Sequence, residues 1–436
     1  MKLINNNEII NNFIESVKLE LKDDEIKALK IFLNGLVIEG EPSIKKIAEN
    51  TIDSFNERTM NRKLKSISMN SKEILKKYLK MFQEVPYLAF KKSGVLSLDE
   101  HIIGKSGEKI EGVDYYYSPV EKKNILGLSM ISVHYYDDKK EYPVIFDIYR
   151  KKSELEKYKK EELYKPKNEI ARDLIDEVLK ISGVCNTWVF DRYFMTKDTA
   201  KLLIRRGQFY VSKIKRNWNC TYKNIKYRMS ELYNTIKEEE FEIVKVKLTY
   251  NKEYRYFKAA LRNVFIKKLG DQLVLFIKEL KKDENGNLEE KYNGNYQILV
   301  SNMINSSMSE IIKTYMKRWR IETSYRDQNQ NLGLCKCRWR NIEGQYCFIA
   351  LVFLAYLMLC WAQYWNYLEV YSDDLRTIGA KKEAYKRYSI ELFSQWITNL
   401  KKECEHCKLS NLIYKLVYNK KIENYRVDLN VGFKST

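Results

Sequence analysis

Apolar side chains in the first 90 residues recur every three or four positions. Ile44 and Ile47 fall on one face of a short predicted helix, and Met60 and Leu64 fall on one face of the next. This spacing is typical of amphipathic helices, so we predict an N-terminal helical domain over residues 1–90. The second short helix is rich in arginine and lysine, which fits a helix-turn-helix DNA-binding unit. An ordinary helical bundle with solvated lysines fits the same pattern.

From residue 91 the pattern changes to short apolar runs typical of strands. Two of these runs end on a carboxylate, at Asp99 and at Asp191. The predicted order over residues 91–215 is three strands, a helix, a strand, a helix and a strand. Strands and helices arranged in this way predict a mixed sheet with flanking helices, so the fold class is α+β or α/β.

Residues 216–300 alternate apolar and polar positions in several segments, with a turn at Asn285 and Gly286. Period-two alternation predicts a β-meander, which we interpret as a β-rich insertion domain. We expect residues 301–365 to return to the core begun by residues 91–215. Residues 366–436 are charged, aromatic and mostly helical in pattern, which predicts a C-terminal helical region.

The segment that begins at Ser309 has the most informative polar pattern. It contains no Gly or Pro before Gly333, so we predict one long helix that starts near Ser309 and stops at Gly333. Helical geometry places four of its residues on one stripe: Tyr315, Arg318, Glu322 and Asn329. Either Glu322 forms ion pairs within the helix, or it holds a cation while its neighbours hold phosphate.

Composition adds a candidate partner. The chain has 436 residues, with 78 Lys and Arg against 58 Asp and Glu, and a formal net charge of +20. A basic excess of this size favours a polyanionic partner, and nucleic acid is the first candidate. An anionic membrane surface and a solvated basic surface without function are the alternatives.

The most hydrophobic stretch, residues 346–362, has two interpretations. It is slightly short for a membrane helix. Its position directly after the polar helix favours a buried core helix. The first residues contain no apolar run of the kind that a signal peptide needs.

The chain has eight cysteines and no dense, short cysteine spacing. We therefore expect reduced thiols in a cytosol. Cys404 and Cys407 enclose His406, which is half of a zinc site at best, and surface thiols are the simpler interpretation.

The spacing Tyr315-x2-Arg318-x3-Glu322 resembles the signature of the IS4-type DDE transposases, in which a lysine occupies the position of Asn329. The run at residues 332–341 resembles these proteins as well. A β-rich insertion before the glutamate helix is a further point of resemblance.

The resemblance implies an RNase H-like core, with the order of strands and helices predicted above. In such a core Asp99, Asp191 and Glu322 occupy the positions of three catalytic carboxylates. The resemblance implies that they bind two Mg²⁺ ions, for which Mn²⁺ can substitute, and carboxylate oxygens suit such hard cations. We expect Asp99 to bridge both ions, with Asp191 and Glu322 each holding one.

The first of these positions leaves an alternative open. The family has an Asp-Asp-Thr block where this chain has Asp99, Glu100 and His101. Either Asp99 or Glu100 is therefore the first metal ligand, and Asp99 fits better because it ends the apolar run. We interpret His101 as a neighbour of the site rather than a catalytic group.

Candidate DNA contacts follow from the same resemblance. We expect Tyr315 and Arg318 to hold a backbone phosphate beside the metals, because a guanidinium binds phosphate in a bidentate manner. Trp319 either stacks on an unpaired base or packs as a core aromatic residue.

Asn329 departs from the family pattern because it cannot supply the positive charge of the family lysine. Either Lys336 or Arg326 compensates, or this copy of the enzyme is weakened. Restoring a lysine at position 329 is expected to raise activity.

The resemblance implies the transposase of an insertion sequence. Such an enzyme cleaves and joins DNA at the terminal inverted repeats of its element and at a target site, by cut-and-paste transposition. We expect a homodimer on DNA, in the cytoplasm of a prokaryotic cell and without a membrane. The alternatives are an inactive copy that acts as a DNA-binding protein, and a membrane-associated basic protein anchored by residues 346–362.

Overall fold

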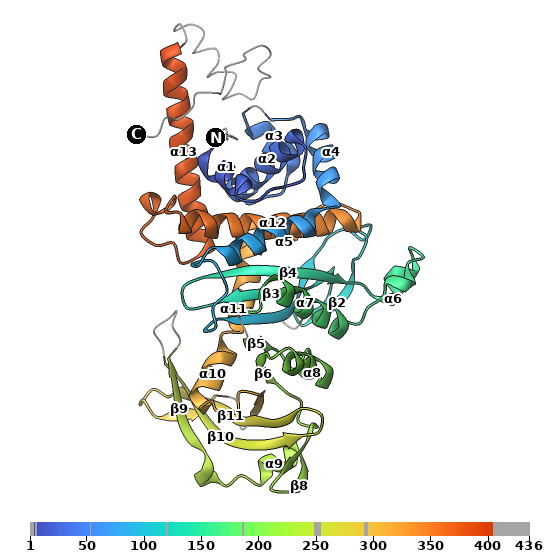
Figure 1. The fold of residues 1–436 in the computed structure, drawn as a ribbon, viewed down its shortest axis with the longest axis vertical. Helices are drawn as coiled ribbons and strands as arrows, with labels where there is room; N and C mark the ends of the chain where they lie inside the picture. Colours follow the sequence, from blue (N-terminus) through green and yellow to red (C-terminus); the bar gives the residue numbers. More distant parts are fainter. Residues whose placement is uncertain are drawn as a thin grey trace.

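The computed structural model describes residue 4 and residues 7–52, 54–118, 121–184, 187–247, 254–291 and 295–403. The molecule is elongated (Figure 1). A layer of helices lies at one end, a sheet lies in the middle, and a second group of strands lies at the other end.

The helical layer is formed mainly by the N-terminal part of the chain. Its helices are α1 (Glu8–Glu15), α2 (Asp23–Glu39), α3 (Ile44–Asn50), α4 (Glu57–Ser68) and α5 (Ser71–Glu84). The two short helices expected from the sequence correspond to α3 and α4, and Ile47, Met60 and Leu64 are fully buried as their spacing predicts. The helix-turn-helix function and the domain boundary at residue 90 stay predictions.

The central sheet is built around β1, which is antiparallel to β3 and parallel to β5. β4 pairs with β3, and β6 runs parallel to β5. The strands are β1 (Val95–Gly104), β2 (Asp114–Ser118), β3 (Lys123–Tyr136), β4 (Glu141–Tyr149), β5 (Thr187–Phe190) and β6 (Phe209–Lys213). This mixed α/β arrangement is consistent with the expected RNase H-like core.

Helices cover both faces of this sheet. α7 (Lys167–Ile181) packs against β3 and β4 on one face. α8 (Lys197–Arg205) packs beside β6. The short helices α6 (Lys152–Glu156) and η1 (Glu161–Leu163) come between β4 and α7 along the chain. Successive side chains of a strand point to opposite faces, and β1 contacts α7 and α11 through adjacent residues, so these two helices lie on opposite faces.

The strands predicted for residues 216–300 are present, and they continue the central sheet. β13 (Gln297–Ser301) joins the two groups because it is antiparallel to both β6 and β11. The other elements are β7 (Asn219–Tyr222), β8 (Ile225–Arg228), α9 (Met229–Asn234), η2 (Glu238–Glu240), β9 (Glu242–Lys247), β10 (Tyr254–Ile266), β11 (Gly270–Lys282) and β12 (Leu288–Glu290). Whether residues 216–300 form a separate domain stays a prediction.

The prediction of one uninterrupted helix after Ser309 is wrong. The segment forms α10 (Met308–Met316) and α11 (Trp319–Leu332), with a tight turn at Lys317 and Arg318 between them. Ser307, not Ser309, caps the first helix. α10 packs on β5, β6 and β9, whereas α11 packs on β1, β3 and α12, so tertiary contacts divide the segment. Gly333 ends α11 in a left-handed conformation, as predicted.

The hydrophobic stretch lies in α12 (Ile342–Tyr364), which is long and apolar enough to cross a membrane. However, 94% of its most hydrophobic window is buried inside the protein, against α2, α4, α5 and β4. This burial supports the interpretation as a core helix.

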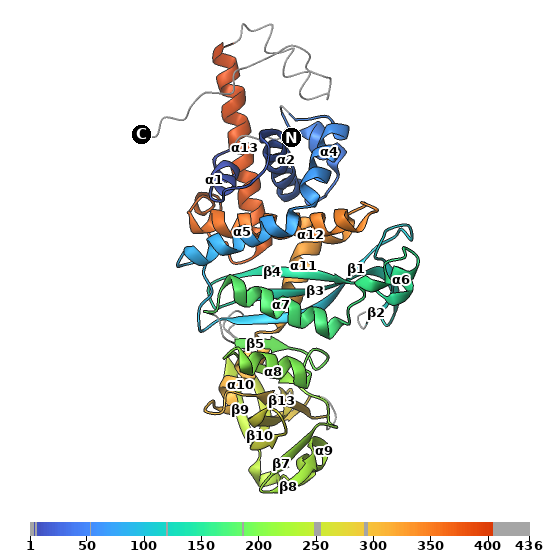
Figure 2. The same cartoon turned by 45° about the vertical axis from the view of Figure 1, so that its right-hand side comes forward.

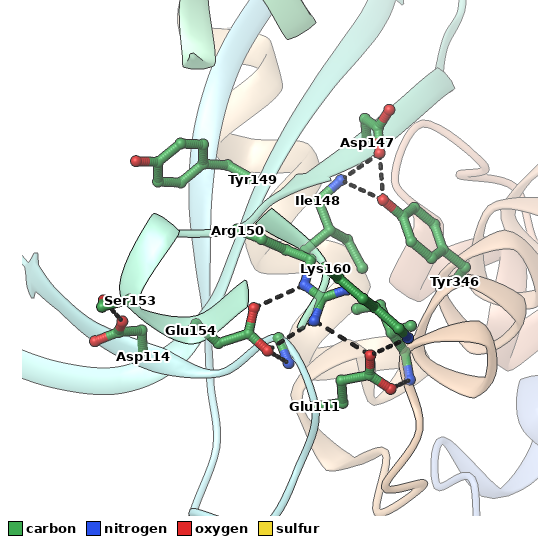
Figure 3. Close-up of polar contacts among 12 residues, drawn as sticks. Glu111, Asp114, Asp147, Ile148, Tyr149, Arg150, Ser153, Glu154, Lys160 and Tyr346 are labelled. Carbon is green, nitrogen blue, oxygen red and sulfur yellow. Dashed lines mark hydrogen bonds and ion pairs between the residues drawn. The ribbon is translucent and has the colours of Figure 1, made fainter. Parts of the chain in front are cut away.

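Charged residues anchor the start of α12 (Figure 3). The cap residue Asn341 makes no side-chain hydrogen bond to the helix, and Glu111 Oε2 instead accepts one from the Ile342 amide at 3.2 Å. The other oxygen of Glu111 lies 3.2 Å from Arg150 Nη2 and 3.0 Å from Lys160 Nζ. Burial raises the pKa of Glu111, but hydrogen bonds and nearby cations outweigh it and lower the pKa overall.

The described chain ends with η4 (Glu369–Tyr371) and α13 (Ile378–Glu403), and η3 (Leu334–Lys336) links α11 to α12. α13 packs on α2, α11 and α12 and projects from the helical layer (Figure 2). The described cysteines have free thiols: Cys220, Cys335, Cys337, Cys347 and Cys360. Cys404 and Cys407, which we interpret as surface thiols, lie outside the described residues.

Candidate active site

Three parallel strands bring charged residues to one edge of the central sheet. Leu98 of β1 is paired with Phe190 of β5, and Phe190 is paired with Ser212 of β6. The residues that follow each of them are Asp99, Asp191 and Lys213. Because the strands are parallel and in register, these three side chains leave the sheet at one level.

α11 brings Glu322 to the same edge through Arg318. The guanidinium Nη1 lies 2.7 Å from Asp99 Oδ2, and Nη2 lies 2.6 Å from Glu322 Oε1. The exposed fraction is 14% for the Arg318 side chain, 18% for Asp99 and 32% for Glu322, so water screens these charges only in part. Arg318 thus holds together two carboxylates that are far apart in sequence.

The pKa of Asp99 reports the electrostatics of the site. Burial is the main cause that raises the pKa of Asp99 to about 6; the neighbouring carboxylates Glu322 and Asp191 act in the same direction, and Arg318 opposes them. Asp191 therefore acts electrostatically on Asp99, as its place on the next strand requires. The Tyr325 hydroxyl donates to the backbone oxygen of Asp99 at 3.1 Å, which fixes α11 against β1.

Asp99, Asp191 and Glu322 supply carboxylate oxygens along one edge of the sheet, and a hard divalent cation prefers oxygen ligands of this kind. Over the residues that the structure describes, no group of three His, Cys, Asp or Glu side chains is close enough to hold a metal ion. Arg318 lies between Asp99 and Glu322 and supplies the positive charge there.

The alternative ligand Glu100 points away from these carboxylates. Its Oε1 accepts hydrogen bonds from Lys167 Nζ at 2.5 Å and Ser129 Oγ at 2.6 Å, on the α7 face of the sheet. His101 lies on the α11 face, stacked on Tyr325 with ring centroids 4.5 Å apart. Burial lowers the pKa of His101 to about 4. The geometry therefore groups Asp99, rather than Glu100, with Asp191 and Glu322.

The candidate DNA-binding residues fall into two groups. Tyr315 is buried beside Arg318 and Lys213. Trp319 is 48% exposed at the start of α11, so the interpretation as a core aromatic residue is wrong. Arg326 and Lys336 are exposed, and Lys336 Nζ lies 3.3 Å from Glu41.

Asn329 is only partly exposed. Its Nδ2 lies 3.1 Å from His101 Nε2, two residues beyond Asp99 on β1. Whether any of these side chains contacts DNA stays a prediction.

Lys213 is a member of the site that the sequence analysis missed. Its ammonium lies 5.4 Å from the ring centroid of Tyr315, and burial lowers its pKa while Asp191 raises it. The signal was available, because Lys213 ends the strand Phe209–Lys213 as Asp99 and Asp191 end their apolar runs. A lysine at the end of a strand is a weaker indication of an active site than an aspartate.

An open pocket of about 770 Å³ begins at Asp191 and continues toward β13. Its walls carry the cations Arg192, Lys213, Lys215 and Arg216, together with Asn217, Asn295, Tyr296 and Gln297. The Arg216 guanidinium lies 4.1 Å from the ring centroid of Tyr296. The carboxylate edge therefore opens into a basic channel.

Comparison with known families agrees with this geometry. Residues 164–358 match the family model described as the transposase DDE domain. The match includes Asp191, Lys213, Arg318 and Glu322, and β1 with Asp99 precedes it. No curated protein matches the chain.

The matched region supports a DDE transposase, and the family implies an enzyme of DNA cleavage and transposition that acts on DNA and normally uses divalent metal ions.

Proposed function

We propose that this protein is the transposase of an IS4-type insertion sequence and performs cut-and-paste transposition. The observation that carries the proposal is that Asp99 and Asp191 follow paired positions of the neighbouring parallel strands β1 and β5, while Arg318 joins Asp99 to Glu322 of α11. The DDE match over residues 164–358 supports the same reaction class.

In this proposal Asp99, Asp191 and Glu322 hold two Mg²⁺ ions, or Mn²⁺ in their place. Bound ions of this kind activate the attacking oxygen and stabilise the leaving oxygen of a phosphodiester. Arg318 offers a planar guanidinium that can bind phosphate oxygens in place of its carboxylate partners. Lys213 adds a second cation beside Asp191 and helps to neutralise the charge of the phosphate.

The remaining parts of the proposal concern partners and place. The substrates are the terminal inverted repeats of the element and a target DNA, bound by a homodimer in the cytoplasm of a prokaryotic cell. The exposure of Trp319, next to Arg318 in the chain, supports the proposal that its ring stacks on an unpaired base.

Strand nicking tests this function. Asp99→Ala, Asp191→Ala and Glu322→Ala are each expected to abolish Mg²⁺- and Mn²⁺-dependent nicking, while gel-shift binding of DNA survives. Glu100→Gln is the control, because Glu100 pairs with Lys167 on the opposite face and its variant should keep nicking. Nicking by an alanine variant at the wild-type rate would remove that residue from the site. Binding without any nicking by the wild type would favour the alternative function, an inactive copy that binds DNA.

A further inference from the structure

A second pocket adjoins the basic channel and has no role in the proposed cleavage. It has a volume of about 290 Å³ and is lined by Asn168, Arg192, Tyr193, Met195, Thr196, Lys197, Lys215 and Trp218. Arg192 and Lys215 line both pockets, so the two pockets are adjacent. The first pocket includes Asp191, and the second includes Lys197 at the start of α8.

The cations of this pocket lack carboxylate partners. Within the described ranges of the chain, Arg192, Lys197 and Lys215 form no ion pair, and all three are exposed. Basic residues just before α7 and just after α8 do form ion pairs: Lys165 pairs with Asp173 at 2.7 Å, and Arg206 pairs with Asp176 at 2.8 Å. Uncompensated cations gathered around one hollow create a positive potential that attracts an anion.

Two aromatic side chains share the pocket with these cations. Tyr193 is 51% exposed and lies beside Arg192, and Trp218 is partly exposed. Cations interleaved with accessible aromatic faces are typical of sites that bind single-stranded nucleic acid, where the cations hold phosphates and the rings stack on bases. A pocket of about 290 Å³ is too small for a double helix and suits a single nucleotide.

We propose that this second pocket, at Lys197, Lys215 and Trp218, binds a nucleotide of an unpaired DNA strand that continues from the cleavage site. The inference rests on the proposed function, because Asp191 marks where the strand is cut. The strand comes either from the end of a cleaved duplex or from an opened segment of intact duplex, and both present the same phosphates and base faces.

The test is fluorescence anisotropy with the full-length protein and three labelled probes of arbitrary sequence. The probes are a blunt 20-base-pair duplex, the same duplex with a tail of six thymidines, and a duplex with an internal bubble of six thymidines. The test variant is the double variant Lys197→Gln, Lys215→Gln. The matched control is Lys180→Gln, Lys226→Gln, which removes the same charge at exposed positions outside both pockets.

The test variant is expected to lose about tenfold in affinity for the tailed probe, with little change for the blunt duplex. Its salt slope on the tailed probe should be shallower by about 1.4, since each lost contact to a single strand contributes about 0.7. An equal loss of affinity for the bubble probe supports the proposal and shows that the pocket accepts any unpaired strand. A loss of affinity for the tailed probe alone supports the proposal and shows that the pocket accepts strand ends.

The proposed binding of an unpaired strand would be refuted if the test variant lost equal affinity for the blunt and tailed probes. It would also be refuted if the control variant lost as much affinity as the test variant, or if the wild type did not prefer the tailed probe. Nicking is measured separately on each variant. A protein that nicks normally but shows no tail preference refutes the pocket alone, whereas a protein that prefers the tail but never nicks refutes the proposed function alone.

Discussion

Arg318 donates hydrogen bonds to two carboxylates that belong to distant parts of the chain, Asp99 and Glu322. Replacing it with glutamine should leave two partly buried negative charges facing each other, which costs about 3 kcal/mol of folding free energy without metal. A divalent cation would then replace the missing charge. We therefore predict that Mg²⁺ or Mn²⁺ raises the Tm of Arg318→Gln more than that of the wild type.

Thermal unfolding at several metal concentrations measures this difference. Arg326→Gln is the control, because Arg326 is exposed on the same helix and its loss leaves both carboxylates neutralised. Identical metal-induced shifts in Arg318→Gln and the wild type would show that Arg318 and the metal do not share these carboxylates.

Two of the positions at which this chain departs from the resembled pattern, His101 and Asn329, are in contact with each other. Each departure is therefore compatible with the other, and a lysine introduced at position 329 would meet the His101 ring. We predict that Asn329→Lys alone loses about 1 kcal/mol of stability, because it breaks the contact and places a cation in a partly buried site. The sequence-based expectation that this change alone raises activity needs a partner substitution.

A double-mutant cycle tests this coupling. His101→Thr combined with Asn329→Lys should be more stable and nick faster than either single variant, with a coupling free energy of about 1 kcal/mol or more. Additive effects of the two substitutions on both stability and nicking would contradict the prediction.

At the scale of elements, the first amide of α12 donates a hydrogen bond to a side chain from the loop between β1 and β2. Glu111 accepts the Ile342 amide and pairs with Arg150 and Lys160. Glu111→Ala should remove the acceptor and leave both cations without this partner, so we predict a loss of about 2–3 kcal/mol in the free energy of unfolding. Urea denaturation measures it. The control is Glu108→Ala, on the exposed part of the same loop, which should change the free energy of unfolding by less than about 0.5 kcal/mol. An equal loss of stability in the two variants would contradict the role of Glu111 at the start of α12.

The sequence predicts those elements whose signals are local. Apolar runs that end on Asp99 and Asp191 locate β1 and β5, and Gly333 marks the end of α11 because a left-handed residue favours glycine. The turn at Lys317 and Arg318 has no such signal, since both residues keep right-handed helical angles. It results from α10 and α11 packing on different strands, which only the folded chain defines.

The candidate site divides in the same way. Its carboxylates are recognisable from strand ends and from the Tyr315-Arg318-Glu322 spacing. The ion pair that Arg318 makes with Asp99, 219 positions away, and the contact between His101 and Asn329 depend on strand register and helix packing. No local pattern encodes these contacts.

For the molecule as a whole, the net charge of +20 bears on DNA affinity. We predict that log K for duplex binding falls linearly with log salt, with a slope of about −0.9 for each phosphate that the protein neutralises. Anisotropy titrations between about 50 and 200 mM salt measure this slope, and a binding constant that hardly changes over this range would contradict electrostatic binding.

The exposed arginines of α4, Arg58 and Arg62, supply a local check. Arg58→Gln with Arg62→Gln should make the slope shallower by about 2 if α4 contacts phosphates.

β6 and β13 are hydrogen-bonded neighbours, although all of β7 to β12 separates them along the chain. A ribosome adds about 5–20 residues per second, so several seconds pass between the synthesis of β6 and that of its neighbour. Until then one edge of β6 has no partner strand, and unpaired edges recruit strands of other chains. Translation speed and growth temperature therefore influence how much of the newly made polypeptide escapes aggregation, whatever the stability of the finished enzyme.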